Sequence, residues 1–403
     1  MRTGLLLIAF FLSSVMTMDG QENNNDYLRK VLSNLENIKT ATYRSLTESW
    51  EPGDTTTNIS GFTFVEEYDN PADSTIGASW VNYTDDKKEL TSCYDGHVHI
   101  SYWHDKHGVV VNDFTFRKLP FRPLGSPFFN YAKNIIKYAL TTDDSISVDV
   151  KDSGADYFFR LVINEDEQVE FFGAGHHIPK PPFDMGDPTS IYEMWIGKLN
   201  DLPYKIRREM SHNISANTCF DVQLNKLEAT EIKASDYIPK DYEVREYGKK
   251  YDTKPQPDLT GKQAPDWTLM DIKEQMVSLS ELKSKVILIE FTGIGCGPCM
   301  ASIPFLNELK KKYSATDLTV VGIETWNRKT RSLQNYANRH AIGYTFLSGN
   351  DEIVDNYQVG LAAPAFFILD ENRIIRKIVR GYNSENTGKE ISNLINELLK
   401  SGS

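Results

Sequence analysis

The sequence predicts a two-domain protein, with a β-rich α+β domain followed by an α/β domain. Its 403 residues exceed what a single hydrophobic core usually holds. Residues 22–245 contain short alternating strands separated by turn signals, a pattern typical of an antiparallel sheet. Residues 258–403 alternate strands with helices, which predicts an α/β fold. The polar, proline-containing stretch 246–257 between them is predicted to be a linker.

Residues 1–20 are typical of a secretory signal peptide. Arg2 precedes an apolar run that is too short to cross a membrane comfortably, and cleavage is expected near Gly20. The first cysteine is Cys93, so this segment lacks the cysteine of a lipid-anchor signal. The mature chain is therefore expected to be soluble, and an uncleaved membrane anchor is the alternative.

The first domain is expected to open with a helix over residues 26–37. Strands follow over residues 41–50, 61–68 and 97–103, and the Asp95-Gly96 pair predicts a tight turn. Antiparallel pairing of such strands gives the predicted sheet.

Histidines and cysteines in this domain leave two questions open. Four histidines lie within eleven positions: His97, His99, His104 and His107. A strand over 97–103 would put His97 and His99 on one face, which permits a metal site, but solvated histidines near a turn are the commoner arrangement, and no metal is predicted. Cys93 and Cys219 fit either a structural disulfide or two buried thiols.

The second domain carries a reactive pair of thiols in Cys296-Gly-Pro-Cys299. An apolar strand over 286–291 precedes the pair, and a helix over 300–313 follows it. Unpaired N–H groups at a helix N-terminus favour negative charge, so a surface Cys296 is expected to have a lowered pKa and to attack as a thiolate. Cys299 is then the resolving thiol. Pro298 stiffens the turn, and Gly297 lets another backbone approach.

Glu290 is the one charged residue within that apolar strand. A desolvated carboxyl there is expected to have a raised pKa and to exchange a proton with Cys299, although a strand-end carboxylate facing solvent is the alternative. A zinc site normally needs further cysteine or histidine ligands, and after Cys299 the sequence offers only His340. A redox dithiol without cofactor or metal is the favoured interpretation.

Residues 258–403 resemble the thioredoxin superfamily, and within it the TlpA/ResA-like envelope disulfide reductases. The entry segment from Gly261 through Trp267, the Cys-Gly-Pro-Cys motif and Pro304 in the following helix match the family pattern. Ala363 and Pro364, just before an apolar strand, resemble the cis-proline loop that faces the dithiol and docks substrate. The family usually has tryptophan before the first cysteine, whereas this chain has Gly295.

The resemblance implies an enzyme that reduces protein disulfides in the periplasm or cell envelope. Cys296 would form a mixed disulfide with a client, and Cys299, deprotonated with help from Glu290, would release the reduced product. The oxidised pair would then need electrons, which a membrane-bound thiol carrier supplies in this family. Low reduction potentials accompany the Gly-Pro pair, so a reductant is expected.

Residues 22–245 loosely resemble the curved half-barrel of LolA/LppX-type lipoprotein carriers. The similarity includes the opening helix, the Tyr94-Asp-Gly turn and the stretch that begins at Tyr192. In that family the concave face holds an apolar ligand. Here the same face could bind an apolar ligand, dock a protein substrate or act only as a spacer.

Two other functions remain as alternatives. A peroxiredoxin-like peroxidase needs threonine three positions and proline seven positions before its cysteine, where this chain has Gly293 and Ile289. A binding protein with a non-catalytic thioredoxin-like domain would not need both cysteines and Glu290. The net charge of -12 argues against nucleic acid and anionic membranes as partners.

Overall fold

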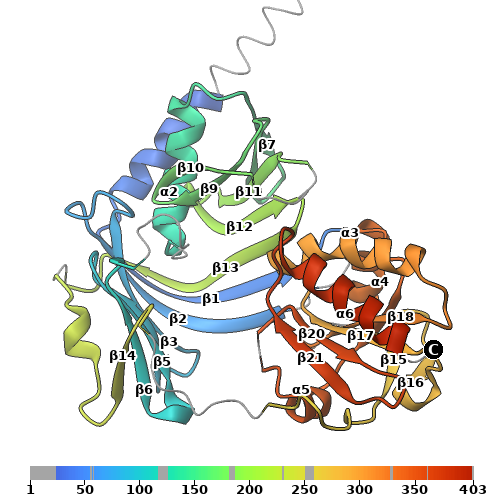
Figure 1. Ribbon diagram of the computed structural model, residues 1–403. Coiled ribbons are helices and arrows are strands. Elements are labelled where there is room, and N and C mark those ends of the chain that lie inside the picture. The colour runs from blue at the N-terminus through green and yellow to red at the C-terminus, as the bar shows by residue number, and fades with distance from the viewer. Residues whose placement is uncertain are drawn as a thin grey trace, which may run out of the picture. The chain divides into compact units, whose positions relative to one another are not determined.

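The computed structural model describes residues 24–54, 57, 59–116, 126–180, 187–228, 231–249, 258–326, 330–360 and 362–401. The predicted signal peptide over 1–20 and residues 250–257 of the predicted linker lie outside these ranges. The chain forms two compact units, one over 1–49, 59–180 and 187–251 and the other over 50–58, 181–186 and 252–403. The first unit is β-rich, and the second has an α/β fold (Figure 1).

The first unit is built on a 12-stranded sheet with the order β14-β6-β5-β4-β3-β2-β1-β13-β12-β11-β8-β7. Neighbours from β1 to β6 and from β13 to β7 run antiparallel, whereas β14 pairs with β6 in parallel. The strands are β1 (Thr40–Trp50), β2 (Ile59–Asp69), β3 (Ala78–Thr84), β4 (Leu90–Tyr94), β5 (His99–Trp103), β6 (Gly108–Asn112), β7 (Ile146–Asp152), β8 (Asp156–Ile163), β11 (Ser190–Gly197), β12 (Leu202–Met210), β13 (Asn213–Leu224) and β14 (Glu243–Glu246). A separate hairpin joins β9 (Gln168–Phe172) and β10 (Ala174–Ile178).

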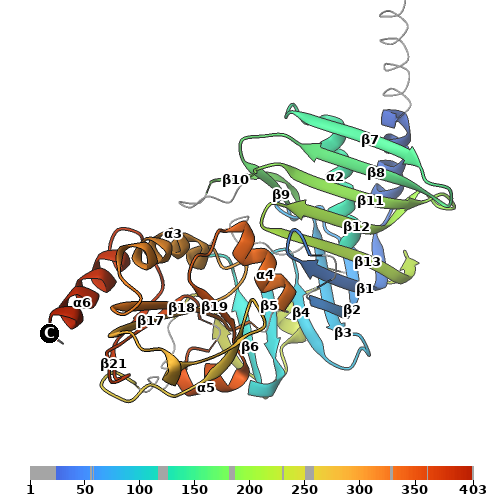
Figure 2. The same cartoon turned by 90° about the vertical axis from the view of Figure 1, so that its right-hand side faces the viewer.

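Two helices cover one face of this sheet (Figures 1 and 2). The chain is helical over 24–36, and α2 spans Phe128–Thr141. Their apolar side chains share a core with β8, β9, β11 and β12, which includes Leu28, Val31, Ile135, Ile136, Phe159 and Met194. The sequence did not predict α2, because its N-cap is Pro127, which offers no side-chain acceptor.

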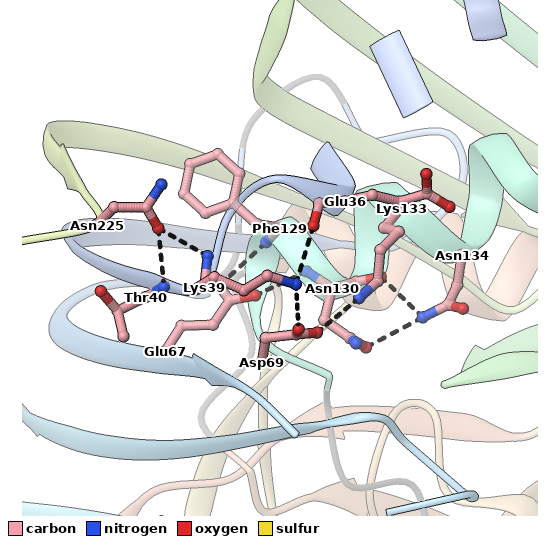
Figure 3. Close-up of polar contacts among 10 residues, drawn as sticks. All are labelled: Glu36, Lys39, Thr40, Glu67, Asp69, Phe129, Asn130, Lys133, Asn134 and Asn225. Atoms are coloured by element: carbon pink, nitrogen blue, oxygen red, sulfur yellow. Dashed lines mark hydrogen bonds and ion pairs between the residues drawn. The ribbon is translucent and has the colours of Figure 1, made fainter. Parts of the chain in front are cut away.

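A carboxylate from a neighbouring strand caps α2 instead (Figure 3). Glu67 on β2 accepts hydrogen bonds from the backbone N–H groups of Phe129 at 3.1 Å and Asn130 at 2.7 Å, and from the Tyr43 hydroxyl at 2.8 Å. Tyr43 Oη in turn accepts from the N–H of Phe128. Three helix N-terminal donors are thus satisfied by side chains far away in sequence.

The structure corrects the prediction for the histidine cluster. His97 lies in the turn before β5, because Asp95 Oδ1 accepts from the backbone N–H groups of His97 and Val98 and holds the turn open. His97 and His99 therefore do not share a strand face. Within the described ranges, no three His, Cys, Asp or Glu side chains are grouped as metal ligands.

The two cysteines of the first unit are free thiols. Cys93 and Cys219 are both buried and belong to separate hydrophobic clusters. Of the two arrangements that the sequence left open, the structure therefore has the buried thiols.

The second unit contains a seven-stranded sheet in the order β16-β15-β19-β18-β17-β20-β21. Helices α3, α4 and α6 pack on one face, and α5 packs on the other. The segment 50–54 belongs to this unit and holds an ion pair between Glu51 and Arg339 of α4 at 3.0 Å. The elements are β15 (Thr268–Asp271), β16 (Met276–Ser278), β17 (Val286–Thr292), α3 (Gly297–Lys312), β18 (Leu318–Glu324), α4 (Thr330–Arg339), β19 (Thr345–Ser348), α5 (Asp351–Tyr357), β20 (Ala365–Leu369), β21 (Ile375–Arg380) and α6 (Thr387–Ser401).

No helix in the described part of the chain is both long and apolar enough to cross a membrane.

Candidate active site

Strand β17 delivers the chain to the dithiol from the centre of the second sheet. All seven of its residues are buried, and it lies between β18, which runs parallel, and β20, which runs antiparallel. Its alternating side chains fill the two opposite cores, so Val286 and Leu288 face α3, and Ile287 and Ile289 face the other layer. This rigid strand fixes the position of the motif that follows.

The two cysteines lie at the start of α3. Cys296 is the N-cap of the helix, and Pro298 occupies its first turn, as the sequence predicted. Cys296 and Cys299 form a disulfide bond. The backbone N–H of Cys299 points at Cys296 Sγ at 3.3 Å, so a helix N-terminal donor is available to stabilise negative charge on that sulfur.

Cys296 is more covered than the sequence suggested. Its side chain was expected at the surface, but the residue is 7% exposed, because the Ala363–Pro364 loop packs against it. Cys299 is completely buried, while Gly295 and Pro298 on either side of Cys296 are exposed. The turn beside Cys296 is therefore open to solvent, whereas Cys299 is shielded.

The loop before β20 faces the disulfide. The peptide bond between Ala363 and Pro364 is cis, as the resemblance implied. Ala363 O lies 3.6 Å from Cys296 Sγ, and β20 beside β17 holds the loop in place. Gly297 and Pro298 of the motif and the Ala363–Pro364 loop thus frame one sulfur.

Glu290 is a buried residue of β17. It is 1% exposed, and burial raises the pKa of its carboxyl to about 8. The solvent-facing alternative is therefore excluded. The sequence placed Glu290 next to Cys299, and the structure joins them through Ser302, whose Oγ lies 2.5 Å from Glu290 Oε1 and 2.7 Å from the carbonyl oxygen of Cys299.

The Ser302 hydroxyl lies between two oxygen atoms, Glu290 Oε1 and the carbonyl oxygen of Cys299. The Ser302 hydroxyl has one hydrogen, but both Cys299 O and an ionised Glu290 could only accept. The hydroxyl can donate this hydrogen to Glu290 Oε1 or to the carbonyl oxygen of Cys299. Burial raises the pKa of the Glu290 carboxyl to about 8, which favours its protonated form at neutral pH.

Sequence reasoning missed two residues of this site. Ser302 lies three positions after Cys299, on the buried side of α3, and that spacing could have identified it. Trp326, after β18, lies so close to Gly293 that a Cβ on this glycine would be 2.4 Å from the indole ring. An indole therefore lies against Gly293, three positions before Cys296, although position 295 directly before Cys296 is glycine.

Comparisons with known proteins agree with this geometry. The Redoxin family model matches residues 259–398. The thiol-disulfide oxidoreductase ResA of Bacillus subtilis strain 168 is 25% identical over 136 residues, which are 34% of this chain and 75% of that protein. ResA of Geobacillus kaustophilus is 28% identical over 122 residues, 30% of this chain and 69% of that protein.

Solved structures are also similar to this part of the chain. A thiol:disulfide interchange protein of the thioredoxin family from Chlorobium tepidum is 20% identical, with 36% of this chain and 99% of that chain covered and a TM-score of 0.31. Together with the disulfide at the start of α3, the sequence matches identify the region. Residues 259–398 form a Redoxin domain, and this part of the chain is similar to the ResA thiol-disulfide oxidoreductases of the thioredoxin superfamily.

Proposed function

We propose that this protein reduces disulfide bonds of client proteins in the cell envelope through the Cys296 and Cys299 dithiol. The observation that carries the proposal is a disulfide whose two sulfurs differ, since Cys296 borders an exposed turn at a helix N-terminus and Cys299 is completely buried. This asymmetry suits one sulfur to attack and the other to resolve.

In the proposed reaction, Cys296 thiolate attacks one sulfur of a client disulfide. A bond forms between Cys296 and that sulfur, and the other client sulfur departs as a thiolate. Cys299 then gives its proton to Glu290 and attacks Cys296 Sγ, which releases the second client thiolate. Two electrons have passed to the client, and the enzyme is left with the disulfide and a neutral Glu290.

The proposal also assigns a docking surface for the client, an electron donor and a location in the cell. Gly297, Pro298, Ala363 and Pro364 surround Cys296 and would dock the client backbone. A membrane-bound dithiol would return the enzyme to its reduced form. The apolar segment within residues 1–20 supports export to the periplasm or cell envelope and removal of the signal peptide.

Insulin reduction tests the roles of the two cysteines. Cys296→Ser should abolish activity, whereas Cys299→Ser should still attack and accumulate a mixed disulfide that mass spectrometry detects. Cys219→Ala, which removes a thiol of the other unit, is the control and should retain activity. Full activity in Cys296→Ser would show that the proposed nucleophile is wrong.

The reduction potential tests the direction of electron flow. Equilibration in dithiol buffers with thiol alkylation should give a value close to that of thioredoxin, about -270 mV. A value near about -120 mV would identify an oxidant that installs disulfides instead.

A further inference from the structure

Residues 50–54 belong to the second unit and are held against the helix α4 by polar contacts. Asp54 accepts hydrogen bonds from Ser332 Oγ at 2.7 Å and from Asn335 Nδ2. Ser332 and Asn335 lie three residues apart, so their side chains share one face of the helix. One carboxylate thus joins the segment to two positions of α4, which fixes the residues around it.

The same segment places a buried carboxyl group beside the dithiol motif. Glu51 is 4% exposed, and Arg339 of α4 donates to its Oε2 from Nη2 at 3.0 Å. Arg339 Nη1 also donates to the carbonyl oxygen of Pro52 at 3.1 Å. The second carboxyl oxygen, Glu51 Oε1, would lie 3.8 Å from a Cβ on Gly295, the residue directly before Cys296. The ion pair therefore presents its carboxylate, rather than its guanidinium, to Gly295.

Glu51 and the helix α3 act on Cys296 in opposite directions. The backbone N–H of Cys299 at the helix N-terminus stabilises a thiolate on Cys296. A carboxylate next to Gly295 repels the same negative charge, and repulsion between charges is stronger where water is excluded. Arg339 offsets part of this repulsion because it is paired with the carboxylate. The ion pair therefore influences how readily Cys296 ionises.

Two further buried carboxyl groups, on β17 and β18, have different contacts. Glu290 of β17 is linked to the backbone of Cys299 through a serine hydroxyl. Glu324, the last residue of β18, accepts from the backbone N–H of Trp326 at 3.1 Å. The loop before β20 presents a backbone carbonyl oxygen to the first cysteine. Glu51 is therefore the carboxylate that lies against the residue directly before the first cysteine.

We propose that Glu51 sets the reactivity of the dithiol: its carboxylate lowers the fraction of Cys296 that is ionised, and Arg339 limits this effect. Glu51 acts through Cys296, so it is a positioning residue and not a catalytic one. A less stable thiolate destabilises the reduced pair relative to the disulfide, which favours transfer of electrons to clients. That consequence rests on the proposed reductase function, whereas the effect on the thiol does not.

Alkylation of the reduced, full-length protein tests this assignment. The rate at which iodoacetamide labels Cys296, followed by mass spectrometry between about pH 5 and pH 10, has its midpoint at the thiol pKa. Glu51→Gln keeps the size of the side chain but removes its charge. The midpoint should therefore fall by at least about 0.5 pH units, roughly threefold in the ionisation constant. The plateau at high pH should not rise, because access to Cys296 is unchanged.

Glu281→Gln removes an exposed carboxylate of the same unit by the same substitution and is the matched control. Its midpoint should equal that of the wild type. An unchanged midpoint in Glu51→Gln, or an equal fall in Glu281→Gln, would overturn the proposal.

A double variant separates charge from packing. In Glu51→Gln, Arg339 remains as a cation without its carboxylate partner and itself favours the thiolate. Adding Arg339→Gln should therefore return the midpoint toward the wild-type value by at least about half of the shift. A midpoint that stays at the Glu51→Gln value would trace the shift to altered packing and would also overturn the proposal. Near-ultraviolet circular dichroism checks that each variant is folded.

These measurements need neither a client nor an electron donor. They hold whether the protein reduces disulfides or installs them, which insulin reduction and the reduction potential test separately. Failure of this proposal and failure of the proposed reductase function are therefore distinguishable.

Discussion

Glu290 and Ser302 form a buried hydrogen bond near the proposed redox dithiol. An ionised carboxyl within the core formed by β17 and α3 would lose its hydration without gaining a cation. Burial raises the pKa of Glu290, which favours the neutral carboxyl and so lowers this desolvation cost, and the Ser302 hydroxyl lies beside it. In the proposed reaction, a neutral Glu290 is the form that would give a proton to Cys299 when the disulfide opens.

Replacing Glu290 should slow turnover and remove a titration. Glu290→Gln should lower the insulin-reduction rate at pH 7 by about a hundredfold, because positioned proton transfer contributes roughly that much or more. Infrared difference spectra of the oxidised wild type should show a protonated carboxyl that disappears with a midpoint near pH 8, the raised pKa of Glu290.

Glu281→Gln changes an exposed carboxyl of the same unit and serves as the control. It should leave the rate and this infrared band unchanged. Persistence of the band with the same midpoint in Glu290→Gln would assign the titration to another group and contradict the role of Glu290.

Residues of the site differ in how well the sequence predicts them. Cys296 and Cys299 are recognisable by spacing, and Glu290 by its charge within an apolar run. Ser302 is marked only by its position three residues after Cys299, and its importance depends on the contact with Glu290 of β17. The covered state of Cys296 also depends on a loop 67 residues away.

At the scale of elements, α2 depends on a contact that is distant in sequence. Glu67 from β2 supplies the N-terminal cap that Pro127 cannot, and Asp69 two residues later binds Lys133 of the same helix at 3.2 Å (Figure 3). The strand therefore fixes both the start and the orientation of the helix.

Removal of this cap should destabilise the first unit. Glu67→Ala leaves two helix N–H groups and the Tyr43 hydroxyl buried without their acceptor, which should cost about 2–4 kcal/mol in the free energy of unfolding. Urea unfolding and hydrogen exchange of the Phe129 and Asn130 amides measure the effect. Glu66→Ala, on the neighbouring residue, should cost less than about 1 kcal/mol.

The same variant should change the pH dependence of stability. Burial raises the pKa of Glu67 from 4.5 to about 7, so the folded state keeps a proton that the unfolded state releases. This contribution is fully present below pH 4.5 and is lost as pH rises to about 7. Glu67→Ala should lack that decline, and an identical decline in the variant would contradict the assignment.

Elements with local signals were predicted well, and elements that depend on distant contacts were not. Strand β17 carries an uninterrupted apolar run because both of its faces are buried, so its sequence identifies it. Helix α2 lacks a local cap, and β5 begins two residues later than expected because of the Asp95 turn.

The whole molecule has four cysteines in two chemical classes. Cys93 and Cys219 are buried, and burial raises the pKa of Cys93 to about 12 and that of Cys219 well above its usual value. Neither should react with alkylating reagents while the protein is folded.

Thiol counting by mass spectrometry tests this division. The untreated, oxidised protein should take up no iodoacetamide when native and two labels in denaturant, at Cys93 and Cys219. After reduction, native labelling should be fastest at Cys296, and denaturant should give four labels. A peptide that links Cys93 to Cys219 would contradict the free thiols.

Sequence patterns indicate that the chain has two folds, but they do not show which unit every segment joins. Turn-rich alternating strands and the dithiol motif separate the two folds in the sequence. The assignment of residues 50–58 to the second unit rests on contacts such as that between Glu51 and Arg339, which no local pattern shows.

The parallel pairing of β14 with β6 has a consequence for aggregation. Strand β6 contains Val109, Val110 and Val111, and its backbone groups would be open to another chain if β14 were absent. Strand β14 is short and charged, with Glu243 paired to Arg245, so it ends the sheet with a poor template for further strands. A fragment of the first unit that stopped before residue 243 would expose the valine edge and would be prone to form fibrils.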